Sequence, residues 1–358
     1  MESQLLLTGS TGAIGRRLLP SLLATGASRR VTVLVRDPDQ ALKHPGVDVL
    51  VGDLRSPKLG LDGTTWGSLA DSITDVVHCA ADTRFTQSIE DARAVNTIGT
   101  RTLLGLARQA KRLRRFAHVS TTFVMGRDSG ELPERQYVNR GGFVNTYEQS
   151  KYEAECEVFA AMPEIPIGVF RLSSVAGQQS TYFERAVRMI PRNPFATIPA
   201  GRDCRIDLIS EAWAVAALAE LFERHFSAGR VYNICAGPAA SVPVGVLLES
   251  AFAAMGVQRL PTMVGLEDFE RFAAKFLSNG HREPVKELLR SVSTFLPHLA
   301  IDQRFQNAAT LELLKGGNTA PCDSFGVLRE MLVRLNGHAG TIEPAARATL
   351  LPSTEVAV

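Results

Sequence analysis

The chain has 358 residues, of which 45% are hydrophobic and 21% charged, and its formal net charge at pH 7 is +2. A chain of this length buries a substantial core, and so small a net charge argues against nucleic acid or an anionic membrane as the main partner. No apolar run approaches the roughly 18 residues of a membrane span, and the N-terminus shows no basic region of a secretory signal. Because the five cysteines are scattered and lack CxxC pairing, we predict reduced thiols and a cytoplasmic location.

The first expected turn is rich in glycine and joins a strand to a helix. An apolar strand over residues 5–7 precedes it, and an amphipathic run begins at residue 16. Glycines let a backbone approach phosphates, and a helix N-terminus offers free N–H groups and the positive end of a dipole. The spacing G-x-x-G-x-x-G at this junction therefore predicts a cradle for a dinucleotide pyrophosphate, formed by Thr8, Gly9, Thr11, Gly12, Ala13, Ile14 and Gly15.

Strand-like and helix-like segments then alternate up to about residue 235. The β-branched and apolar runs predict strands over 31–35, 47–51, 75–79, 116–119 and 167–170. Helical periodicity predicts helices over 89–110 and 147–161. Apolar strands with helical crossovers form a parallel sheet that is covered on both faces. We predict an α/β, doubly wound (Rossmann) fold with ligands at the carboxyl ends of its strands.

Beyond residue 235 the pattern becomes mostly helical, with expected helices over 244–255, 264–277, 284–292, 308–315 and 325–336. Gly316 and Gly337 are expected to end two of them. We therefore predict a dinucleotide-binding domain with the catalytic residues over 1–235, including substrate-pocket segments near 178–210. A smaller, mostly helical substrate-binding part over 236–338 and a flexible tail over 339–358 complete the predicted organisation.

Tyr147 and Lys151 lie four residues apart at the start of an expected helix, so both side chains share one face. A tyrosine transfers protons near neutral pH only when its pKa falls from about 10, and an adjacent ammonium lowers it. Lys151 could also hydrogen-bond a cofactor ribose. The pair follows the strand that ends at Thr121, and the glycine turn precedes both.

In this order, the motifs resemble those of the extended short-chain dehydrogenase/reductase family over roughly residues 4–235. The resemblance implies that Asp53 and Leu54 hold the adenine and that Asn96 supports the active site. It also implies a stretch lining the cofactor after the fourth strand, formed by Cys79, Ala80 and Ala81. Thr121, Tyr147 and Lys151 would be the catalytic set, with Ser173 and Val175 near the nicotinamide.

Three longer stretches, at 80–85, 118–126 and 145–155, resemble the thioester-reductase and fatty-acyl reductase branch of that family. The resemblance implies hydride transfer to the carbonyl of a small-molecule or carrier-bound acyl substrate, with a thioester or another lipid-like carbonyl compound favoured. It also implies a possible homodimer, because extended members often pair through a four-helix interface.

The cofactor is predicted from the end of the second strand, where NADP enzymes place an arginine and NAD enzymes an acidic residue. The strand ends in Val35-Arg36, so Arg36 can pair with a 2′-phosphate. Arg16 offers a second contact. A shift of one residue would present Asp37 instead, so NADPH is favoured over NADH without excluding it.

Other functions remain open for the same scaffold. A ketone or hydroxysteroid-type dehydrogenase and an NAD-dependent sugar-nucleotide epimerase would share the fold, and a non-catalytic NADP-sensing regulator would share the cofactor. The seven histidines show no metal-ligand spacing, so we predict no metal.

Overall fold

The computed structural model describes residues 3–24, 29–177, 184, 187, 197–258, 260–279, 283–317, 319 and 322–336. Three predictions fall wholly or partly outside these residues: the tail over 339–358, the cap at Gly337, and the pocket segments near 178–210, of which 178–196 is described only at residues 184 and 187.

Seven parallel strands form the central sheet, which confirms the predicted doubly wound fold. β1 pairs with β2 on one side and with β4 on the other, so the strand order reverses at this point. In spatial order the strands are β3 (Val47–Val51), β2 (Arg29–Val35), β1 (Ser3–Thr8), β4 (Asp75–His78), β5 (Arg115–Thr121), β7 (Ile167–Leu172) and β12 (Val231–Ile234).

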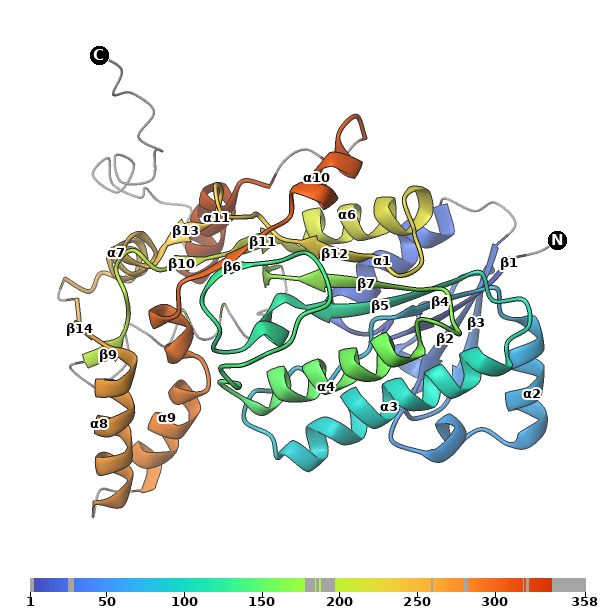
Figure 1. Cartoon of the computed structure of the whole chain (residues 1–358), viewed down its shortest axis with the longest axis horizontal. Helices are drawn as coiled ribbons and strands as arrows, with labels where there is room; N and C mark the ends of the chain where they lie inside the picture. The colour runs from blue at the N-terminus through green and yellow to red at the C-terminus, as the bar shows by residue number, and fades with distance from the viewer. Residues whose placement is uncertain are drawn as a thin grey trace.

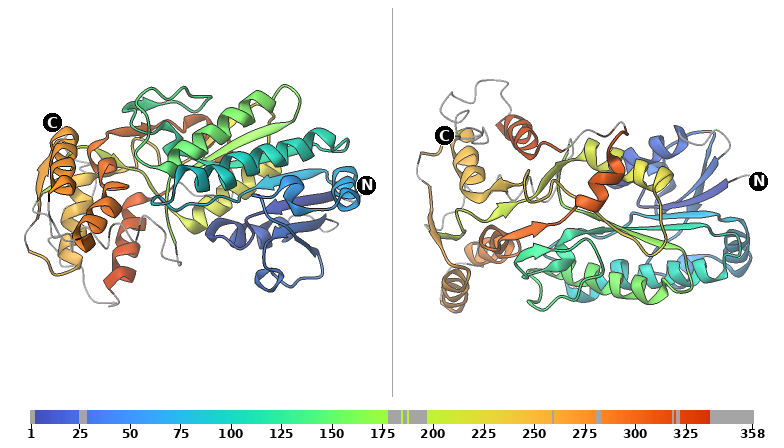
Figure 2. Two further views of the ribbon diagram at one scale, coloured as in Figure 1. Left: turned by 90° about the horizontal axis from the view of Figure 1, so that it is seen from below. Right: turned by 45° about the horizontal axis from the view of Figure 1, so that its top comes forward.

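Helices cover both faces of this sheet, as Figure 1 and the right-hand view of Figure 2 show. One layer consists of α1 (Ala13–Ala24) and α6 (Glu211–Arg224), and the other of α2 (Gly63–Ser72), α3 (Ile89–Gln109) and α4 (Thr146–Ala161). Successive residues of a strand point to opposite faces. Accordingly, Leu5 and Leu7 belong to the core beneath α1 and α6, while Leu6 belongs to the core beneath the other layer.

Polar side chains fix where the helices begin. The oxygens of Asp62, Ser88, Asn145 and Ser210 accept hydrogen bonds from the backbone N–H three residues later, at the starts of α2, α3, α4 and α6. Such caps satisfy N–H groups that have no partner within the helix. The cap at Asn145 fixes the first turn of α4, which carries Tyr147 and Lys151.

Four two-stranded sheets extend the fold beyond the carboxyl ends of the main strands. Three of them pair a strand before residue 235 with one after it: β6 (Gly130–Leu132) with β15 (Gln303–Phe305), β9 (Thr197–Pro199) with β14 (Thr262–Val264), and β10 (Arg205–Ile206) with β13 (Val242–Pro243). The fourth pairs β8 (Ser174–Ala176) with β11 (Leu208–Ser210). These pairings tie the C-terminal part to the sheet, and the boundary at residue 235 stays a prediction.

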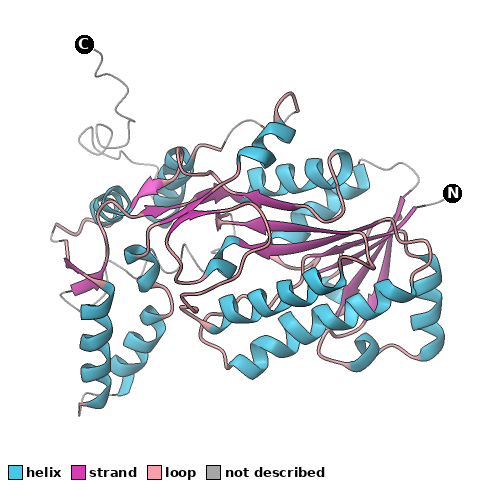
Figure 3. Ribbon diagram, viewed as in Figure 1, coloured by secondary structure: helices cyan, strands magenta, loops and turns pink. Residues whose placement is uncertain are grey.

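The C-terminal part is mostly helical, as expected, and lies largely at the end of the molecule opposite the start of β1 (Figures 1 and 3). Its helices are α7 (Val244–Ala254), α8 (Leu266–Ser278), α9 (Glu283–Ser293), α10 (Ala308–Leu314) and α11 (Ser324–Asn336), with a 3₁₀ turn, η5 (Leu296–Ala300). The expected helix over 264–277 begins only at Leu266, because Val264 pairs with β9. Gly316 has a φ of +81°, which agrees with its predicted place after α10. No helix in the described ranges combines the length and the apolar character that crossing a bilayer requires.

Candidate active site

The glycine-rich turn after β1 brings the backbone against the loop after β4. Gly9 has a φ of +77°, and a Cβ there would lie 2.7 Å from the backbone nitrogen of Ala80. A Cβ on Gly15 would overlap the carbonyl oxygen of Gly9. The turn closes through a 3.0 Å hydrogen bond from the Gly12 N–H to that same oxygen. A side chain therefore fits at neither Gly9 nor Gly15, and α1 starts with its free N–H groups at the turn.

This turn borders a cavity of about 520 Å³, the first cavity, at the carboxyl ends of β1, β2 and β4. The position is the one where open α/β sheets bind ligands. Most predicted cofactor residues line it: Thr8, Gly9, Thr11, Gly12, Arg36, Asp53, Leu54, Cys79, Ala80 and Ala81. Further lining residues were not predicted from the sequence, namely Leu34, Val35, Gly52, Asp82, Thr83, Arg84 and Val95.

The first cavity carries two carboxylates and a free arginine. Arg55 hydrogen-bonds Asp53 and holds the pKa of this carboxyl below its usual value, and Arg84 does the same for Asp82. Arg36 adds a weaker electrostatic contribution to both. Within the described residues Arg36 forms no ion pair of its own, so its guanidinium is available to an anionic ligand.

The structure also separates Arg36 from its neighbour Asp37. The Asp37 carboxylate accepts hydrogen bonds from the Asp39 N–H at 3.0 Å and from Gln40 Nε2 at 2.8 Å. It thereby caps the 3₁₀ turn η1 (Pro38–Gln40) that follows β2. Arg36, unlike Asp37, is among the residues that line the first cavity.

Arg16 does not line the first cavity. Its Nη2 donates to the Thr11 carbonyl oxygen at 3.2 Å, on the surface of the glycine turn. The second phosphate contact expected from Arg16 therefore stays a prediction.

A second cavity, of about 350 Å³, continues from the first along the glycine turn. The two share Gly9, Gly12, Cys79, Ala81 and Thr83, so together they suit an elongated ligand. The second cavity brings together residues from four separate segments that the sequence singled out: Ala13, Ile14 and Gly15; Thr121; Tyr147 and Lys151; Ser173 and Val175.

The Tyr147 hydroxyl is hydrogen-bonded to Thr121, and the aromatic ring stacks on Phe85 with the two centroids 5.4 Å apart. Lys151 lies deeper and is buried. Its Nζ donates to the Val119 carbonyl oxygen at 3.0 Å and lies 3.5 Å from His118 Nε2. The hydroxyl groups of Thr121 and Tyr147 thus lie together at the second cavity, and the Lys151 amine lies deeper in the protein.

The expectation that Lys151 lowers the pKa of Tyr147 is not met. Burial raises the pKa of the Tyr147 phenol, and the hydrogen bond with Thr121, which lowers it, does not offset this effect. Burial also lowers the pKa of Lys151 to about 8. The physical reason is that removal from water penalises both the phenolate and the ammonium, and the sequence alone does not reveal that burial.

Asn96 lines neither cavity but joins two walls of the site. It is buried, its Oδ1 accepts from the Asp82 N–H at 2.8 Å, and its Nδ2 donates to the Asp82 carbonyl oxygen at 3.0 Å. The same amide donates to Ser150 Oγ at 2.9 Å. Asn96 therefore holds the loop after β4 against the helix that carries Lys151, which agrees with the supporting position implied for it.

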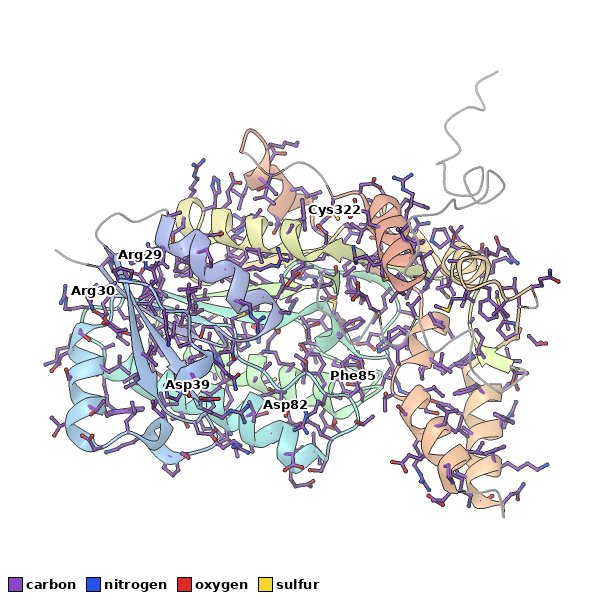
Figure 4. All side chains as sticks on the ribbon, turned by 180° about the vertical axis from the view of Figure 1, so that it is seen from behind. Arg29, Arg30, Asp39, Asp82, Phe85 and Cys322 are labelled. Carbon is purple, nitrogen blue, oxygen red and sulfur yellow. The ribbon has the colours of Figure 1, made fainter. Side chains whose placement is uncertain are left out.

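Three aromatic side chains form one wall of the second cavity, and the sequence analysis did not predict them as lining residues. They are Phe85, Phe123 and Phe295. Phe85 and Phe123 follow the ends of β4 and β5. Because ligands bind at the carboxyl ends of parallel strands, these positions were the signal from which both residues could have been predicted. Phe295 lies between α9 and η5, where no motif marks it. Figure 4 labels Phe85, which lies nearer the C-terminal helices than Asp82 on the same loop. The other lining residues are Thr83, Val119 and Ser120, together with Leu172 and Ser174 beside the predicted Ser173 and Val175.

The five cysteines are free, as their scatter in the sequence predicts. Throughout the part of the chain that the structure describes, no group of three or more His, Cys, Asp and Glu residues is arranged to hold a metal ion.

Comparison with known families and proteins identifies relatives of this arrangement. Residues 38–202 match the family described as male sterility protein. The hybrid PKS-NRPS synthetase pvhA of Talaromyces variabilis is 33% identical over 175 residues, which is 48% of this chain and 4% of that synthetase. Fatty acyl-CoA reductase 1 of Xenopus laevis is 35% identical over 145 residues, which is 33% of this chain and 28% of the reductase. The chain thus spans less than a third of the length of either relative.

Solved structures agree on the fold over nearly the whole chain. The terminal R domain from the myxalamid PKS-NRPS biosynthetic pathway has a TM-score of 0.73 at 22% identity, covering 94% of this chain and 92% of that domain. MoeE5 in complex with UDP-glucuronic acid and NAD has a TM-score of 0.63 at 20% identity, covering 93% and 99%. At these identities the likeness concerns the fold alone.

Proposed function

We propose, on the premise that residues 38–202 match the male sterility family, that the chain is an NADPH-dependent reductase of acyl thioesters or closely related lipid-like carbonyl compounds. The observation that carries the proposal is the second cavity, in which Thr121, Tyr147 and Lys151 meet the glycine turn. Similarity to a fatty acyl-CoA reductase supports a thioester as the substrate, either a small molecule or bound to a carrier.

The site supports the stabilisation of a developing oxyanion. A carbonyl oxygen beside Thr121 and Tyr147 would accept hydrogen bonds from both hydroxyl groups, where negative charge grows during reduction. Tyr147 would then donate its proton to that oxygen. Lys151, held by the Val119 carbonyl oxygen, would place a positive charge beneath the tyrosine. NADPH bound along the two cavities would supply the hydride.

Reduction of a thioester proceeds in two bond-breaking stages. Hydride addition to the carbonyl carbon, with the proton from Tyr147, gives a hemithioacetal. This intermediate breaks its carbon–sulfur bond and releases an aldehyde and a free thiol, so one NADPH and one proton are consumed for each thiol. The apolar wall of Phe85, Phe123 and Phe295 supports an acyl chain beside the carbonyl.

The test of this function is NADPH consumption, with NADH in parallel, against long-chain acyl-CoA thioesters, fatty aldehydes and cyclic ketones. We expect NADPH oxidation with the thioesters and the release of thiol, measured with a colorimetric thiol reagent. Turnover with ketones alone would favour a ketone or hydroxysteroid-type dehydrogenase. Tightly bound NAD in the purified protein without net turnover would favour an epimerase. NADPH binding without any turnover would favour a regulator.

The preference for NADPH is assigned to Arg36. A charge-assisted hydrogen bond is worth about 1.5–3 kcal/mol, so Arg36→Ala should weaken NADPH binding roughly tenfold to a hundredfold and leave NADH binding nearly unchanged. Titration of cofactor fluorescence measures both constants. Arg30→Ala is the matched control, because Arg30 lies on the same strand and pairs with Asp48. Equal losses for both cofactors in Arg36→Ala would contradict the assignment.

A further inference from the structure

A buried, hydrogen-bonded histidine–glutamate pair joins α4, the helix that carries Tyr147 and Lys151, to the C-terminal part of the chain. Nε2 of His298, on η5, lies 2.7 Å from Oε1 of Glu148, in the first turn of α4. The two side chains are 2% and 0% exposed. Glu148 directly follows Tyr147, so His298 contacts α4 at the residue next to the proposed proton donor.

A second set of hydrogen bonds reinforces this junction. Glu148 Oε2 accepts from the Val144 N–H at 2.9 Å, and Glu148 Oε1 accepts from Asn145 Nδ2, also at 2.9 Å. The same Asn145 amide donates to the Thr294 carbonyl oxygen at 3.1 Å. Residues 294 and 298 are therefore both fastened to the N-terminal turn of α4, and Phe295 lies between them in the chain.

The junction holds part of the aromatic wall. The His298 ring packs against Phe123, with centroids 4.8 Å apart, and against Phe295, with centroids 5.9 Å apart. Both phenylalanines line the second cavity, whereas His298 and Glu148 are not among its lining residues. The pair can therefore influence a bound substrate only through the side chains that it positions.

We infer that Phe295 determines which acyl groups the site admits beside the carbonyl, and that the Glu148–His298 pair is the positioning element that fixes Phe295 against α4. The inference rests on the proposed function, since it concerns the acyl group of the same substrate. Removing the His298 imidazole leaves the buried Glu148 carboxylate without one of its hydrogen-bond partners. Loss of the His298 imidazole should therefore leave Phe295 less firmly positioned, although His298 itself does not line the cavity.

The test compares straight-chain with α-methyl-branched acyl-CoA thioesters in the full chain. Phe295→Ala should raise the kcat/KM ratio of branched to straight substrate about tenfold, because one aromatic ring less widens the space beside the carbonyl. His298→Leu should shift the ratio in the same direction, mainly through KM. His298→Gln should restore it, since its amide can donate to the same Glu148 oxygen. NADPH affinity should stay unchanged in the two His298 variants, because His298 lines neither cavity.

Glu134→Gln provides the matched control for a general loss of stability. Glu134 also ties the C-terminal part to the sheet, through the Asn233 N–H at 3.0 Å and the Thr310 N–H at 3.2 Å, but it lines neither cavity. Its variant should leave the substrate ratio unchanged. The same shift in Glu134→Gln, or no shift in Phe295→Ala, would overturn the inference.

Hydrogen exchange separates this inference from the proposed function. In His298→Leu, the amides of residues 144–151 and 294–299 should exchange faster together, while Glu134→Gln leaves both segments unchanged. This measurement needs no turnover. If no thioester is reduced by the parent chain but the coupled exchange is observed, the proposed function fails and the junction stands. Unchanged exchange in His298→Leu overturns the positioning role even where thioesters are reduced.

Discussion

Replacing Tyr147 with phenylalanine should lower kcat for thioester reduction by about 10²–10⁴-fold, the range typical of losing a general acid. The substitution removes one hydroxyl group and keeps the ring that stacks on Phe85. The proton donor and one of the two hydrogen bonds to the developing oxyanion are lost together. Single-turnover oxidation of NADPH measures the chemical step directly. NADPH affinity should change little, because the glycine turn and Arg36 remain.

The control for this substitution lies on the same helix. Tyr152→Phe removes a hydroxyl from a tyrosine that packs against Phe143 and lines neither cavity, so kcat should stay near the parent value. Turnover in Tyr147→Phe comparable to that of Tyr152→Phe would show that the proton comes from another group. Loss of NADPH binding in Tyr147→Phe would show that the tyrosine serves the cofactor instead.

The part of the site that follows from the sequence is the part carried by strand ends and helix starts. Gly9 and Gly15 are required by close backbone approach, and Thr121 ends a buried strand. Because the carboxyl ends of parallel strands share one edge of a sheet, these positions converge without any knowledge of tertiary contacts. Tyr147 and Lys151 converge with them because they share one face of α4.

The features that the sequence did not reveal depend on burial and on long-range contact. Phe295 reaches the second cavity from 148 positions beyond Tyr147, and no local pattern distinguishes it from other core phenylalanines. The pKa of Tyr147 depends on how much water surrounds the phenol, so the expected direction was wrong. The choice between Arg36 and Asp37 as the residue facing the first cavity required the turn η1, which Asp37 caps.

A second large effect is expected from Glu155→Gln. The carboxylate of Glu155, on α4, binds Arg171 of β7 through two hydrogen bonds, of 2.9 Å and 2.6 Å, and the two side chains are 2% and 0% exposed. Arg171 Nη1 also donates to the Arg135 carbonyl oxygen at 2.9 Å. Removing the carboxylate leaves a guanidinium that cannot lose its proton in the interior. The free energy of unfolding should fall by about 3–5 kcal/mol, the usual loss when one partner of a buried pair is removed.

Urea unfolding followed by circular dichroism measures this loss. The exposed pair Arg101–Glu157, which joins α3 to α4, is the matched control, and Glu157→Gln should cost less than about 1 kcal/mol. Replacing both buried partners, as in Glu155→Leu with Arg171→Met, should recover much of the stability, because no charge is then left uncompensated. A loss in Glu155→Gln no larger than in Glu157→Gln would contradict the assignment.

The Glu155–Arg171 pair lies close to the second cavity, so losing it should affect turnover as well as stability. Glu155 lies one helical turn after Lys151, and Arg171 lies two residues before Ser173, which lines the second cavity. The pair therefore fastens α4, which carries Tyr147 and Lys151, to the strand that leads into the predicted nicotinamide site. At a low temperature at which the Glu155→Gln protein still folds, its kcat should fall while its NADPH affinity at the glycine turn is retained.

The double variant, Glu155→Leu with Arg171→Met, should regain kcat together with stability, because the position of Lys151 depends on how firmly α4 packs on β7. Recovery of stability without recovery of kcat would instead assign the carboxylate itself an electrostatic effect on Lys151.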